Sequence, residues 1–192
     1  MPKKNLISNA KKEEEIKTVF EKFQKYNKSK NLSESTIKYY KNNFKRFNNY
    51  LKRNNIEKIG NITREIIDNY RYESFERTNN ATSVNTYLRA IRTFLNFAIK
   101  RNYLRNIKVE MLNEEEKIKP TYTDKEIELL LEKPNLKEVG FAEYRNWVII
   151  NWLLATGNRA RTVRNIKIKD LDFESGFVRI RKTKNKRQQL IP

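Results

Sequence analysis

The sequence predicts a mainly α protein, in which a bundle of four or five helices precedes a small α+β segment with one antiparallel β-hairpin. Apolar residues recur at three- and four-residue intervals through residues 12–101, which is the helical period. A charged stretch that ends in proline then interrupts this pattern. Near the end of the chain, short apolar runs flank a basic turn, which is typical of a hairpin. The 38% of hydrophobic residues, with 11% aromatics, predicts a modest core rather than disorder.

The composition points to a polyanionic partner. The 192 residues include 42 Lys and Arg against 23 Asp and Glu, a formal net charge of +19, which favours nucleic acid first and an anionic membrane surface second. The chain contains no cysteine and no histidine, so we expect no disulfide, no metal site and no cofactor. No apolar run is long enough to span a bilayer, and residues 1–10 lack the apolar core of a signal peptide. We therefore expect a cytoplasmic protein.

The first two predicted helices follow a basic tail at residues 1–11. The first covers about Lys12 to Lys28, and Glu13, Glu14 and Glu15 would lie in its first turn, where the helix dipole favours acids. Ser33 is a suitable N-cap for the second, which runs to about Asn54. Its apolar stripe consists of Ile37, Tyr40, Phe44, Phe47 and Leu51.

A second stripe lies one residue further along the same helix. Its members are phosphate-binding types at helical spacing: Lys38, Lys41, Lys45, Asn48 and Lys52. The alternative is a solvated lysine face, which is the usual meaning of such a pattern. We retain both interpretations and take Lys38, Lys41 and Lys45 as candidate contacts to DNA.

Two further helices complete the predicted bundle. Thr63 would cap the third, Asn79-Asn80 would form a turn, and Thr82 or Ser83 would start the fourth. The core face of the fourth helix is apolar, and the adjacent face carries Asn85, Arg89, Arg92 and Asn96. Asn and Arg can bond base edges bidentately in a major groove. The candidate base contacts are therefore Asn85, Arg89 and Arg92.

The chain then divides into a helical domain (1–112), a linker (113–121) and a second domain (122–192). Thr123 and Glu126 form a predicted capping box that starts a helix to about Glu132. The next helix, from Phe141 to Ala155, is apolar on nearly every side, so we expect it to be buried. Gly157 suits a left-handed cap after it. A short helix at 161–166 and two strands around a basic turn follow, and we expect Asp170 and Asp172 to form a turn or cap.

The motif Thr156-Gly157-Asn158-Arg159, the Asp170-Leu171-Asp172 segment and the basic hairpin ending at Pro192 together resemble the first half of the catalytic domain of tyrosine recombinases, the phage-type integrases. The segment TSVNTYLRAIRTFLNFAIKRNYLRN is similar to the last long helix of that family's SAM-like core-binding domain. The resemblance implies that Arg159 contacts the scissile phosphate. It also implies that a lysine in the hairpin turn protonates the leaving oxygen. Counting back from Pro192 favours Lys184, with Lys182 as the alternative.

The chain departs from the family pattern at several points. It has Thr162 where the family usually has glutamate and Asn158 where the family has an aliphatic residue. It has no histidine and no segment like that of the family's tyrosine nucleophile. We therefore expect a portion of a recombinase for DNA integration, serving a mobile element or prophage. It would clamp double-stranded DNA without cleaving it and would self-associate on DNA when full length.

Two other functions remain open from the sequence. The second hypothesis, after the recombinase, is a stand-alone non-catalytic DNA-binding protein or repressor at recombination sites. A basic protein that binds RNA or an anionic membrane is the third hypothesis.

Overall fold

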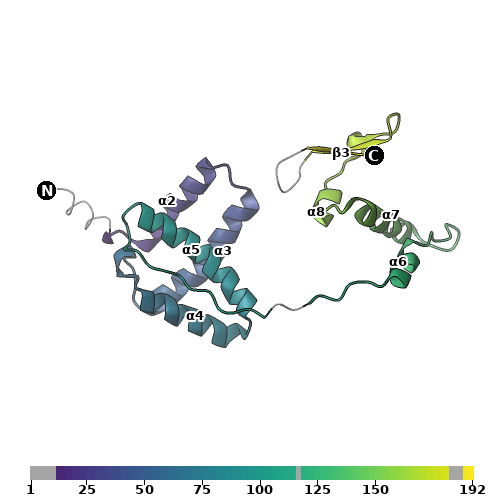
Figure 1. Ribbon diagram of the computed structural model, residues 1–192. Coiled ribbons are helices and arrows are strands. Elements are labelled where there is room, and N and C mark those ends of the chain that lie inside the picture. Colours follow the sequence, from purple (N-terminus) through teal and green to yellow (C-terminus); the bar gives the residue numbers. More distant parts are fainter. Residues whose placement is uncertain (1–11, 116–117, 182–187) are drawn as a thin grey trace. The chain divides into compact units, whose positions relative to one another are not determined.

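The computed structural model describes residues 12–115, 118–181 and 188–192 (Figure 1). The chain forms two compact units, Met1–Lys117 and Ile118–Pro192, and the division falls inside the stretch 113–121. Within the described ranges, no helix is both long and apolar enough to cross a membrane.

The first unit is a helical bundle. Its helices are α2 (Ile16–Ser29), α3 (Glu34–Arg53), α4 (Arg64–Thr78) and α5 (Ala81–Lys100), with a 3-10 turn, η1 (Ile59–Asn61), between α3 and α4. The side chains of Ser33 and Thr63 accept hydrogen bonds from the third backbone N–H beyond them, which confirms both predicted caps. Asn80, rather than Thr82 or Ser83, caps α5.

Helix α2 starts later than predicted. Glu15 is its N-cap, so the expectation that three glutamates fill the first turn was wrong. The backbone of this segment instead pairs with the loop before η1. The Ile16 N–H donates to the Glu57 carbonyl at 2.9 Å, and the Ile59 N–H donates to the Glu14 carbonyl at 3.0 Å. These bonds hold Glu15 in extended conformation, paired with Lys58, and fix where the helix begins.

The core of the first unit is rich in phenylalanine. Phe20 of α2 stacks on Phe44 of α3 with ring centroids 3.6 Å apart, and Phe94 of α5 meets both rings edge-on. The chain after α5 also joins this core, because Tyr103, Leu104 and Val109 are buried there. The segment that leads out of the bundle is therefore packed along it rather than solvated.

The second unit combines short helices with a small sheet. Its elements are α6 (Asp124–Leu131), α7 (Phe141–Thr156), α8 (Ala160–Val163), the 3-10 turn η2 (Ile168–Asp170), β1 (Leu171–Asp172), β2 (Phe177–Ile180) and β3 (Gln189–Ile191). The strand order is β1-β2-β3, all antiparallel, and Val178 lies opposite both Leu171 and Ile191. The predicted hairpin is β2–β3. The two-residue strand β1 was not predicted, because two residues carry no periodicity.

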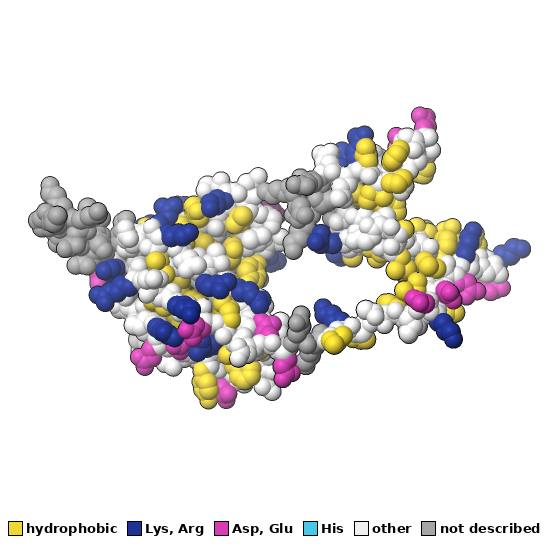
Figure 2. Space-filling model, in the orientation of Figure 1, with side chains coloured by type: hydrophobic (Ala, Val, Ile, Leu, Met, Phe, Trp, Pro, Cys, Tyr) yellow, Lys and Arg dark blue, Asp and Glu magenta, His cyan; other side chains and the backbone are white. Residues whose placement is uncertain are grey.

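Helix α7 is less buried than its sequence predicts. It spans almost the expected residues, yet none of its side chains is buried, and Phe141 is 80% exposed. Its neighbours are chiefly α6 and α8, and the Trp147 indole N–H donates to the Leu131 carbonyl at 2.9 Å. A helix that is apolar all round needs cover on every side, and these two neighbours supply only part of it. Apolar side chains are accordingly visible on the surface of this unit (Figure 2).

Candidate nucleic-acid interface

Helices α3 and α5 lie side by side and form one continuous surface. The Tyr39 hydroxyl donates to the Thr86 carbonyl at 2.7 Å. Further along α3, the Arg46 guanidinium lies 4.7 Å from the centre of the Tyr87 ring and donates to its hydroxyl at 3.3 Å. Burial raises the pKa of Tyr39, so this phenol keeps the proton that it donates. The two contacts hold the helices in a fixed register.

The exposed side of this helix pair is basic. The five lysines and arginines predicted to contact DNA from these helices are all exposed: Lys38, Lys41, Lys45, Arg89 and Arg92. Among the residues that the structure describes, no acid forms an ion pair with Lys38, Lys41, Lys45 or Arg92. Lys and Arg side chains are spread over the visible face of this unit (Figure 2). Uncompensated cations on a rigid pair of helices suit a row of phosphates.

Asn85 does not belong to this surface, and its prediction as a base contact was wrong. Its side chain is only 2% exposed. Its amide donates to the Leu112 carbonyl at 2.9 Å and accepts from the Leu112 N–H at 2.8 Å. Both ends of the amide are therefore used to hold the chain that leaves the bundle. A buried amide that satisfies two backbone groups is a structural element rather than a reader of bases.

Glu114 is a residue of this surface that sequence analysis missed. Its carboxylate accepts from Arg89 Nη2 at 3.0 Å and also from the Asn85 amide. Hydrogen bonds from Asn85 and Thr82, followed by the charge of Arg89, hold the pKa of Glu114 below its usual value. The sequence had placed Glu114 in the predicted linker at 113–121, where no contact with the bundle was expected. No signal in the sequence connects residue 114 to residue 89, because the contact depends on the chain folding back along α5.

In the second unit, Arg159 is the residue directly before α8. Gly157 adopts the left-handed conformation predicted for it, with φ of 62°, and ends α7. The Arg159 carbonyl accepts from the Thr162 N–H at 2.7 Å, so the backbone of Arg159 starts α8. Its side chain is exposed, and no described residue forms a hydrogen bond or ion pair with its guanidinium.

Lys184 and its alternative Lys182 lie outside the described residues. The described residues on either side are Arg181, after β2, and Gln188, before β3.

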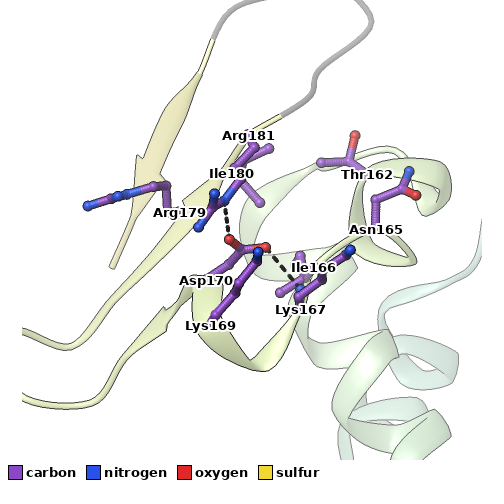
Figure 3. A pocket seen from close by; sticks show the side chains of 9 residues that line it. All are labelled: Thr162, Asn165, Ile166, Lys167, Lys169, Asp170, Arg179, Ile180 and Arg181. Atoms are coloured by element: carbon purple, nitrogen blue, oxygen red, sulfur yellow. Dashed lines mark hydrogen bonds and ion pairs between the residues drawn. The ribbon is translucent and has the colours of Figure 1, made fainter.

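A basic cavity of about 320 Å³ lies between α8, η2 and β2 (Figure 3). Its polar lining comes from α8 and the turn after it, from η2, and from the end of β2 with the residue that follows: Thr162, Asn165, Lys167, Lys169, Asp170, Arg179 and Arg181. Asp170 is 5% exposed and accepts from the Lys167 N–H at 3.1 Å and from Arg181 Nε. Burial raises the pKa of Asp170, but the bonds from Lys167 and Arg181 outweigh it and lower the pKa overall.

This arrangement confirms the predicted capping role of Asp170. It also ties the end of β2 to η2. With Arg181 paired to Asp170, the remaining cations at the cavity are Lys167, Lys169 and Arg179, which would suit an anion.

Comparisons with known proteins agree with this architecture. The family described as "Phage integrase, N-terminal SAM-like domain" matches residues 20–102, and the family described as "Phage integrase family" matches residues 121–192. The chain is 30% identical over 182 residues to tyrosine recombinase XerD of Staphylococcus haemolyticus, covering 92% of this chain and 60% of that protein. It is 29% identical over 167 residues to XerD of Staphylococcus epidermidis, covering 85% and 55%. The chain thus spans little more than half the length of these relatives.

A solved structure, a lambda integrase dimer bound to a COC′ core site, has a similar fold. The TM-score is 0.71 at 14% identity, and the match covers 100% of this chain and 52% of that one. A second lambda integrase dimer on a COC′ core site, residues 75–356, gives a TM-score of 0.68 and covers 93% and 62%. At this level of identity the likeness establishes the fold.

Proposed function

Because the chain belongs to the phage integrase family of tyrosine recombinases, we propose that it binds double-stranded DNA as part of a site-specific recombinase. The first unit would contact the duplex through the exposed side of α3 and α5. The second unit would bring Arg159 to a phosphate. In the whole protein this arginine and a hairpin lysine, Lys184 or Lys182, would assist strand cleavage. Integration of a mobile element, and self-association on the DNA, belong to the same proposal.

One observation carries the proposal. Lys38, Lys41 and Lys45 are exposed at helical spacing on α3, without an acid partner among the described residues, beside exposed arginines of α5. A net charge of +19 would attract any polyanion, but a row of unpaired cations along one side of a fixed helix pair suits a surface that follows a backbone of phosphates. The DNA-bound lambda integrase dimers of similar fold support duplex DNA as the polyanion.

Arg159 supports the catalytic part of the proposal by its exposure. Its guanidinium has no described partner to displace, and it cannot lose its charge near neutral pH. Neutralising a phosphate in this way lowers the barrier to attack on it. A nucleophile is needed as well, and we assign none of the tyrosines of this chain to that role.

The test measures binding to a mixed-sequence duplex by fluorescence anisotropy over a range of salt concentrations. Replacing Lys38, Lys41 and Lys45 together by glutamine removes three candidate phosphate contacts. The slope of log K against log salt should then fall by about 2.7 in magnitude. The control replaces three exposed lysines of α2 by glutamine, Lys17, Lys25 and Lys28, and changes the net charge equally.

The control should change the slope little. Equal effects of the two triple variants would mean that only the overall charge acts, and the proposed surface would be wrong. Failure of the unaltered chain to bind the duplex at all would refute DNA binding itself.

A further inference from the structure

The DNA-facing side proposed for α5 has an acidic residue fixed on it. Glu114 Oε1 accepts from Arg89 Nη2 and from Asn85 Nδ2 at the same time. The position of Glu114 does not depend on Arg89, because Asn85 holds both backbone groups of Leu112, two residues earlier. The carboxylate is thus delivered to Arg89 by a segment that is already anchored to the bundle.

This contact makes Arg89 different from its basic neighbours. The lysines at 38, 41 and 45 have no acid partner among the described residues, whereas the charge of Arg89 is locally compensated. The Arg89 side chain remains 50% exposed, and the bond to Glu114 uses only Nη2. The remaining N–H groups of the guanidinium form no hydrogen bond or ion pair with another described residue.

A fixed carboxylate affects the two kinds of DNA contact unequally. A phosphate that approached Arg89 would meet the like charge of Glu114, and the two anions would repel. A guanine edge offers neutral acceptors, O6 and N7, and carries no net charge to be repelled. An oriented guanidinium also loses less conformational entropy when it binds a planar edge.

We propose that Glu114 is a specificity-determining residue, which withholds Arg89 from DNA phosphates and positions its exposed N–H groups for a guanine edge. The proposal rests on the proposed DNA-binding function of this surface. It assigns Glu114 a positioning role that acts through Arg89, since the attachment of the linker itself is already provided by Asn85.

The first measurement is the salt dependence of binding to a mixed-sequence duplex. Glu114→Gln should free Arg89 for one phosphate and steepen the slope by about 0.9, which makes the loss of affinity between about 50 and about 200 mM salt roughly 3.5-fold larger. Glu115→Gln is the matched control, because it removes the same charge at the next position, where the structure describes no hydrogen-bond or ion-pair partner. An Arg89→Gln/Glu114→Gln double variant should not show the steeper salt slope, because the guanidinium that would bind the extra phosphate is gone.

The second measurement uses a duplex in which every guanine is replaced by 7-deazaguanine, which lacks the N7 acceptor. The unaltered chain should bind this duplex at least about fivefold more weakly than the normal one. Arg89→Gln should abolish the difference in affinity between the two duplexes. Glu114→Gln should reduce this difference, because Arg89 in that variant can bind a phosphate instead of a guanine. A purely structural role of Glu114 would leave the ratio unchanged.

The outcomes separate the two proposals. If neither the unaltered chain nor any variant binds either duplex, DNA binding by this surface is refuted. If all bind but Glu114→Gln and Glu115→Gln have the same slope, or the guanine analogue makes no difference to the unaltered chain, DNA binding stands and the role of Glu114 is refuted.

Discussion

Replacing Asn85 by alanine should destabilise the first unit without acting on DNA directly. The change removes two hydrogen bonds to Leu112, of 2.9 and 2.8 Å, and leaves the N–H and C=O of Leu112 without their partner. It also removes the hydrogen bond that Asn85 donates to the Glu114 carboxylate. An unsatisfied buried group costs about 1–3 kcal/mol, and Leu112 is only half-buried, so water will satisfy it in part. We expect a loss of about 2 kcal/mol in the free energy of unfolding.

The assay is urea unfolding followed by far-UV circular dichroism at the helical band. With a slope of about 1.5 kcal/mol per molar urea, a loss of about 2 kcal/mol lowers the midpoint by about 1.3 M. The two tryptophans, Trp147 and Trp152, both lie in the second unit, so their fluorescence serves as an internal control that should not shift. Asn96→Ala, at an exposed position of the same helix, should change the free energy of unfolding by no more than about 0.5 kcal/mol.

The opposite pattern would refute this reasoning. If Asn85→Ala left the midpoint unchanged, the Asn85 amide would not stabilise the first unit. The segment at Leu112 would then be held by something other than the amide.

Three further predictions concern the second unit and are followed by tryptophan fluorescence. Thr123→Ala removes the capping box of α6 and should cost about 1 kcal/mol, while Thr121→Ala should cost little. Gly157→Ala places a Cβ at φ of 62° and should cost about 1 kcal/mol; no loss would mean that the left-handed cap relaxes. The lowered pKa of Asp170 stabilises the fold above the unfolded pKa of about 3.9, and that stability is lost as pH falls below it. Asp170→Asn should remove this part of the acid dependence; an unchanged profile would contradict it.

Local signals in the sequence predict the helices well. One to four neighbouring residues suffice to predict each helix cap. The structure confirms the N-caps at Ser33, Thr63 and Thr123 and the left-handed C-cap at Gly157. Each is decided by the backbone groups at a helix end, which neighbouring side chains satisfy whatever the tertiary fold. The start of α2 was misplaced because Glu14 and Glu15 pair with a loop more than forty positions later.

Burial at the edge of a helix could not be predicted in the same way. Periodicity places Asn85 one step from the core face of α5, next to Arg89. Whether such a position is exposed depends on what lies against it, and here the returning segment around Leu112 covers it. Residues 113–121 were predicted to be a linker between the domains, so neither the cover over Asn85 nor the contact of Glu114 with Arg89 was expected.

The opposite error was made for α7. Its composition predicts a buried helix, but burial also needs neighbours, and α6 and α8 cover only part of its surface. The hydrophobicity of a helix indicates how much burial would stabilise it. The arrangement of the other elements determines how much of its surface is buried.

The central claim is that the exposed basic side of α3 and α5 contacts duplex DNA. Acetylation of lysines by a small reagent, mapped by mass spectrometry with and without a mixed-sequence duplex, tests it most directly. If this surface contacts DNA, the duplex should protect Lys41 and Lys45 from acetylation, while Lys17 and Lys25 of α2 should be acetylated as in its absence. Protection of the α2 lysines, with Lys41 and Lys45 still reactive, would contradict it.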